Sequence, residues 1–100
     1  MPEAYQIQAE SRRIEKDFHK VITRLTNEQR FTLKDILQND PKGNAAMHWK
    51  IKKVKKDVWQ CDLPSGYRLE YTVLDTPAKV ILVLFCGNHD DAQAFLRSKS

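Results

Sequence analysis

Arg68, Glu70 and His89 are the residues of this sequence whose types best suit chemistry at a phosphate. Arginine presents a planar fork of donors that matches phosphate oxygens and keeps its charge at neutral pH. Histidine titrates near neutrality, and a carboxylate can act as a general base. Arg68 and Glu70 stand two residues apart in an alternating segment, so we expect them on one face of a strand. These three residues are the candidate catalytic group.

Each candidate also has an ordinary structural interpretation. Arg68 could form an ion pair with Glu70 or with a carboxylate on a neighbouring strand, and Glu70 could be a surface ion-pair partner. His89 follows Gly87 and precedes an acidic, helix-like segment, where a capping residue would also stand. The sequence leaves both interpretations open for all three residues.

Positive charge is concentrated in one short segment of the chain. Residues 42–56 contain six lysines and no acidic residue, whereas the whole chain has a formal net charge of +4. Such a patch favours binding of a polyanion, and nucleic acid is the natural partner. The candidate RNA-binding residues are Lys50, Lys52, Lys53 and Lys55. The alternative is a lysine-rich edge strand that resists aggregation.

The elements that must position these residues follow from periodicity and turn signals. Residues 5–8 and the segments after residue 49 alternate as strands do, whereas Ile14, Phe18, Val21 and Leu25 form one helical stripe. Thr26 and Gln29 have the spacing of a capping box, so a second helix should begin there. The further expected elements are one strand region in which residues 49–52 and 58–63 both alternate, strands at 67–73 and 79–86, and a closing helix at 90–96.

This order predicts an α+β fold: an N-terminal helical hairpin packed on a small, mostly antiparallel four-stranded sheet, with a short C-terminal helix. The helices are expected on one face of the sheet. Residues 79–86 are apolar on both faces, as a central strand is, and one domain should span residues 1–100.

Composition points to a soluble, cytoplasmic protein without a cofactor. No apolar run approaches the ~20 residues of a membrane span, and we expect neither a leader nor membrane binding. Cys61 and Cys86 lie far apart and form no CxxC pair, so we expect two buried, reduced thiols and no metal site.

The segment from Trp59 to Val73, with its Gly66-Tyr67-Arg68-Leu69 core, and the end of the apolar strand at Cys86-Gly87-Asn88-His89 resemble the RelE/ParE toxin superfamily. The resemblance covers nearly the whole chain in element order. It implies a RelE-like toxin of a bacterial toxin-antitoxin module, with a small antitoxin protein as one partner. It also implies that the basic face of the sheet binds messenger RNA, in the RelE branch on the ribosome.

The reaction implied by this resemblance is attack of a ribose 2′-OH on the adjacent phosphate. Arg68 matches the strand arginine that contacts the scissile phosphate, and His89 stands where relatives have an arginine or histidine. Glu70 is the candidate base, as carboxylates are in some relatives. The lysines of residues 50–56 match the basic segment by region only.

The chain departs from the family pattern in two places. Phe95, which has no hydroxyl, stands near the position of a tyrosine in active relatives, and Asp90 and Asp91 add negative charge beside His89. These departures favour the alternative of a non-catalytic RelE-fold protein that binds nucleic acid or a protein partner. A ParE-like gyrase inhibitor is a further alternative.

Replacing Lys50, Lys52, Lys53 and Lys55 with glutamine should weaken RNA binding, because each lysine that contacts a phosphate releases counterions. The slope of log affinity against log salt should fall by about 0.7 for each phosphate of a single strand that the variant no longer neutralises. A salt titration of binding to single-stranded RNA measures this slope. If the slope of the quadruple variant equals that of the parent, the lysine segment does not contact RNA.

Overall fold

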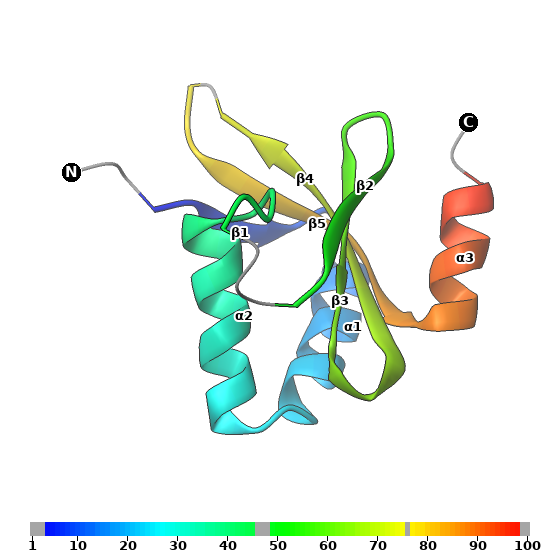
Figure 1. Cartoon of the computed structure of the whole chain (residues 1–100). Helices are drawn as coiled ribbons and strands as arrows, with labels where there is room; N and C mark the ends of the chain where they lie inside the picture. Colours follow the sequence, from blue (N-terminus) through cyan, green and yellow to red (C-terminus); the bar gives the residue numbers. More distant parts are fainter. Residues whose placement is uncertain (1–3, 46–48, 76, 99–100) are drawn as a thin grey trace.

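The computed structural model describes residues 4–45, 49–75 and 77–98, and it contains three α-helices and one sheet (Figure 1). The elements, in chain order, are β1 (Gln6–Ala9), α1 (Arg12–Thr23), α2 (Asn27–Asn39), β2 (Ile51–Lys55), β3 (Val58–Asp62), a 3₁₀ turn (Pro64–Gly66), β4 (Tyr67–Leu74), β5 (Val80–Asn88) and α3 (His89–Arg97). The predicted α+β class and the order of its elements are confirmed.

The sheet has five strands rather than four, in the order β1-β5-β4-β3-β2. β1 runs parallel to β5, and every other pair is antiparallel. The lysine-rich strand and the next strand are separate because the chain turns between them at Lys56 and Asp57, where Asp57 has a φ of 61°. The lysine-rich strand β2 is therefore the edge of the sheet.

The helices do not all pack on one face of the sheet, and that expectation was wrong for α3. Residues of α1 and α2, such as Val21 and Leu37, join the larger apolar cluster with Ile81 and Val83 of β5. Leu96 of α3 joins a separate cluster with Val58 and Leu84. The apolar character of β5 on both faces gives each set of helices a surface to cover.

Side chains define where the helices begin. The Ser11 hydroxyl accepts a hydrogen bond from the Ile14 amide at 3.2 Å at the start of α1. The capping box predicted at Thr26 is present, since the Thr26 hydroxyl and the Gln29 side chain each accept from the other residue's backbone amide. These caps satisfy amides that a helix leaves without partners.

The centre of the core lies on β5 and β4. Ile81 and Val83 are fully buried, as are Leu69 and Tyr71 on the neighbouring strand. The register between the two strands slips after Glu70, so Leu84 has no partner in the ladder and packs in the smaller cluster beneath α3. Strand β5 thus contributes buried side chains to both apolar clusters.

Truncating Ile81 to alanine should lower the free energy of unfolding by about 2 to 5 kcal/mol, because the side chain is wholly buried and its loss leaves a cavity. Leu74→Ala is the control: this side chain is 42% exposed, and its loss should change stability by about 0.5 kcal/mol or less. Urea unfolding measures both. Equal losses in the two variants would contradict the placement of the core.

Candidate functional site

Arg68 lies on β4 with an acidic partner on the next strand. It stands opposite Asp62 of β3 in the register, and its Nε lies 3.1 Å from the Asp62 Oδ1. The Arg68 side chain is 21% exposed, and its Nη1 also donates to the backbone oxygen of Tyr67 at 3.1 Å. The ion pair with a cross-strand carboxylate is therefore present, and the carboxylate belongs to Asp62 rather than Glu70.

Glu70 is completely buried, so the interpretation of it as a surface ion-pair partner was wrong. The Gln60 Nε2 donates to the Glu70 Oε1 at 2.7 Å, and the Glu70 Oε2 has no hydrogen-bond partner among the residues that the structure describes. Burial raises the pKa of Glu70 from 4.5 to about 7, although the Gln60 hydrogen bond and the charges of Arg68 and Lys52 oppose that rise. At neutral pH the Glu70 carboxyl is therefore neutral in part of the molecules and charged in the rest.

A row of facing residues crosses four strands and connects the lysine-rich edge to the buried carboxyl. Lys52 stands opposite Gln60, Gln60 opposite Glu70, and Glu70 opposite Phe85. Arg68 and Asp62 form the neighbouring pair on the same face, two residues along each strand. The fold therefore places Lys52, a predicted RNA-binding residue, on the same face of the sheet as Glu70 and Arg68, two predicted catalytic residues.

The other three lysines are placed differently. Lys53 stands opposite Trp59, whose ring packs against the cluster beneath α1 and α2, so Lys53 belongs to the opposite face from Lys52. Lys50 precedes β2, and Lys55 pairs with Val58 after a register shift. All four lysines are exposed. Lysine side chains at this edge therefore lie on both faces of the sheet.

His89 is the first residue of α3, and the capping role belongs to its neighbour. The Asn88 side chain accepts from the Asp91 amide at 2.8 Å, so Asn88 is the cap. The His89 side chain is 54% exposed, and its Nδ1 lies 3.6 Å from the Asp90 Oδ1. No hydrogen bond or ion pair within the described ranges joins His89 to Arg68 or Glu70.

Helix α3 packs over the end of this row that lies on β5, next to Glu70. The rings of Phe95 and Phe85 stack with centroids 5.2 Å apart. Gly87, opposite Arg68, leaves room for the Phe85 ring, since a Cβ at Gly87 would lie 2.9 Å from the Phe85 Cζ. Phe95, the nearest counterpart of the tyrosine in the resembled family, therefore packs against Phe85.

Sequence reasoning missed Gln60 and Asp62, the residues that hold Glu70 and Arg68. The signal was the alternation of residues 58–62, which places Val58, Gln60 and Asp62 on one face. Gln60 was not singled out because a glutamine in a strand is ordinarily exposed. Its burial, with only 3% of the residue exposed, becomes visible only when α3 is placed over this face.

The cysteines are both buried and unpaired, as predicted. Burial raises the pKa of Cys61 and Cys86 to about 12, so neither thiol is a ready nucleophile at neutral pH. The described residues contain no cluster of three potential metal ligands. None of the described helices has the length and apolarity to cross a bilayer.

The architecture and this face define a RelE-like fold, and comparison with solved structures confirms it. A mutant of the E. coli toxin RelE, solved in complex with an antitoxin RelBc peptide, superposes with a TM-score of 0.57 at 24% identity, covering 97% of this chain and 96% of the toxin. The conserved hypothetical protein HP0892 from Helicobacter pylori superposes with a TM-score of 0.55 at 17% identity, covering 88% of this chain and 98% of HP0892. No family model matches the sequence, and no curated protein matches it.

Because its pKa is about 7 in the folded protein and 4.5 ordinarily, Glu70 binds more protons folded than unfolded between these values. Its contribution to stability is therefore present below about pH 4.5 and is lost as the pH rises to about 7, at up to about 1.4 kcal/mol per pH unit. Glu70→Gln should remove this loss, so that the variant gains stability relative to the parent as the pH rises.

Urea unfolding of both proteins from pH 4.5 to 8 measures the difference, in which the titration of groups that do not interact with Glu70 cancels. Glu15→Gln, on the exposed side of α1, is the control for the loss of one carboxyl from the chain. A constant difference between the parent and the Glu70 variant across this range would show that Glu70 titrates normally.

Proposed function

We propose that this chain is the toxin of a RelE-like toxin-antitoxin module, an endoribonuclease that cleaves messenger RNA on the ribosome and is held inactive by an antitoxin protein. The observation that supports this most is the face of the sheet on which Lys52, Glu70 and Arg68 lie in adjacent rows. The fold of a toxin solved with an antitoxin peptide supports the same class. Such a toxin would act in the cytoplasm.

In the proposed reaction, the ribose 2′-oxygen attacks the adjacent phosphorus and the bond to the 5′-oxygen breaks. Glu70 takes the 2′-OH proton, for which a pKa of about 7 is well matched. Arg68 stabilises the negative charge that develops on the phosphate oxygens. His89 gives a proton to the leaving 5′-oxygen. The products are a 2′,3′-cyclic phosphate and a free 5′-OH.

The lysine-rich edge supplies binding in this proposal. Lys50, Lys52, Lys53 and Lys55 are exposed and take part in no ion pair within the described part of the chain. Cations without protein partners are available to phosphates, and each contact releases counterions from the RNA. Lys52 lies on the same face of the sheet as Arg68. An RNA strand bound at this edge would therefore extend toward the candidate catalytic residues.

A non-catalytic RelE-fold protein that binds RNA or a protein partner is the second candidate, and the burial of Glu70 favours it. The carboxyl has no exposed surface, and α3 packs over its face of the sheet. Arg68 is already paired with Asp62. For catalysis, substrate binding has to open this face and draw Arg68 from its partner. A binding protein needs neither change.

Expression of the chain without any antitoxin separates these candidates. The toxin is expected to arrest growth and to leave messenger RNA cut, whereas a binding protein leaves messenger RNA intact. Normal growth with uncut messenger at high expression would reject the nuclease and favour the second candidate. A variant unable to fold, such as one with Ile81 replaced by aspartate, is the control for effects of expression alone.

Arg68→Ala should lower cleavage by roughly a hundredfold to a thousandfold, the effect usual for loss of one donor to transition-state charge. His89→Ala should lower the rate by ~10² to 10⁴ and alter its pH profile if His89 carries the proton. Arg97→Ala, at the exposed end of α3, is the matched control and should cleave as the parent does. Thermal unfolding checks that each variant is folded. Unchanged cleavage by both site variants would contradict the assignment.

A further inference from the structure

A groove of about 810 Å³ runs between α1 and α3 over the second half of β5. It exists because β1 pairs only with residues 80–83 of β5. From Leu84 onward, no described strand lies beside that edge of β5. Glu10 and Ser11 close one end of the groove, and Tyr67 and Asn88 lie toward the other. The space that a longer β1 would fill is thus left open.

Helix α1 forms a cationic wall along this groove. Arg13, Lys20 and Arg24 line the groove directly. The helix with its C-cap carries five basic residues, Arg12, Arg13, Lys16, Lys20 and Arg24, against two acidic residues, Glu15 and Asp17. All five cations are exposed, and none takes part in a salt bridge among the described residues. They extend over ~18 Å of helix, a length that suits several phosphates of one strand.

Aromatic rings line the opposite side of the groove. Phe85 contributes from β5 and Phe95 from α3, and the two rings stack on each other. Tyr67 is held at the end by Arg24, whose guanidinium donates to the tyrosine hydroxyl and lies 5.9 Å from the ring centroid. A cationic wall beside aromatic rings is the combination with which proteins bind single-stranded nucleic acid.

Three carboxylates also line the groove, namely Glu10, Asp17 and Asp91. They would repel a phosphate placed deep in the groove, but a carboxylate can accept a hydrogen bond from the amino group of a base. The phosphates are therefore expected on the outer cations of α1, such as Arg12 and Lys16, with a base in the groove.

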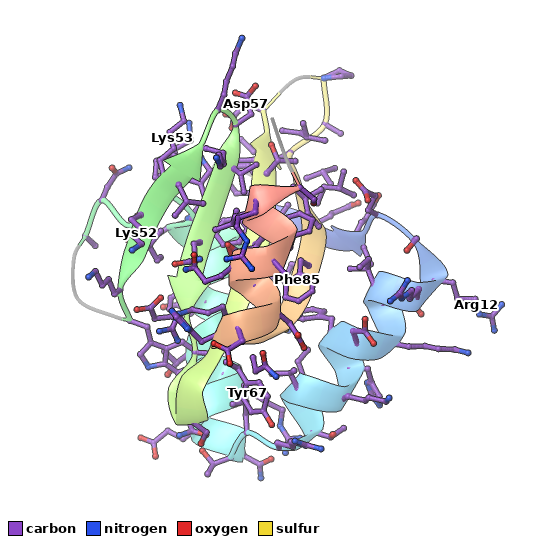
Figure 2. All side chains as sticks on the ribbon, turned by 90° about the vertical axis from the view of Figure 1, so that its right-hand side faces the viewer. Arg12, Lys52, Lys53, Asp57, Tyr67 and Phe85 are labelled. Atoms are coloured by element: carbon purple, nitrogen blue, oxygen red, sulfur yellow. The ribbon has the colours of Figure 1, made fainter. Side chains whose placement is uncertain are left out.

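We propose that this groove is a second binding site for single-stranded RNA, in which phosphates lie on the α1 cations and a base with an amino group enters against Phe85, Phe95 and Tyr67. The site is separate from the lysine-rich edge: Figure 2 shows Arg12 to one side of α3 and Lys52 and Lys53 to the other. The choice of RNA as ligand rests on the proposed function. The binding itself requires no cleavage.

The test measures binding of a 2′-O-methyl oligocytidine of about ten nucleotides, a length within the usual range of single-strand sites. The methyl group blocks 2′-OH attack, so failure of the nuclease proposal leaves this measurement unaffected. In Arg12→Gln with Lys16→Gln, the slope of log affinity against log salt should fall by about 1.4, from about 0.7 per phosphate contact. Arg30→Gln with Lys34→Gln removes the same charge from α2, and its slope should not change. Equal slopes in the two double variants would overturn the proposal.

A second measurement tests the aromatic side of the groove. An abasic oligomer of the same length keeps the phosphates but cannot stack, so it should bind the parent roughly 5- to 150-fold more weakly for each base that stacks. An oligouridine, whose base has no amino group, should also bind more weakly than the oligocytidine. Equal affinity for the abasic oligomer and the oligocytidine would show that the protein recognises only polyanions and that no base enters the groove.

Discussion

The structure depends on strand β5 being apolar on both of its faces. Ile81 and Val83 face the cluster that α1 and α2 cover, and Leu84 faces the cluster that α3 covers. One strand therefore requires helices on both sides of the sheet, since either exposed face would leave an apolar surface in water. The placement of α3 follows from this requirement. So does the division of the surface into a lysine-rich edge on one side of α3 and a groove on the other.

The same packing sets the chemistry of the candidate site. Once α3 covers its face of the sheet, Glu70 loses its water and its charged form becomes unfavourable. Gln60 supplies one hydrogen bond, while the charge of Arg68 is paired with Asp62. A buried carboxyl without full hydrogen bonding lowers stability, and such groups are concentrated at functional sites. The destabilising burial of Glu70 is the strongest physical indication that this face has a role beyond packing.

Much of the fold could be predicted from the sequence because local signals were consistent with the final structure. The capping box at Thr26 and the alternation of residues 67–73 each specify an element without reference to the rest of the chain. The side of the sheet that α3 covers could not be predicted in this way, because it depends on the register slip at Glu70, which no local signal shows. For the same reason, the sequence left open the interpretation of Glu70 as a surface ion-pair partner, which its complete burial contradicts. The cations of α1 were overlooked because the sequence does not show that β1 pairs only with residues 80–83 of β5 and leaves an open groove beside them.

Cleavage of RNA at this face of the sheet is tested most directly by mapping RNA ends after the purified chain has been incubated with translating ribosomes. The proposed chemistry specifies both new ends, because the 2′-oxygen attacks the phosphorus and the 5′-oxygen leaves. Fragments with 2′,3′-cyclic phosphate and 5′-OH ends are expected for the wild-type chain. Intact messenger RNA, or fragments that carry 5′-phosphate ends, would contradict this function.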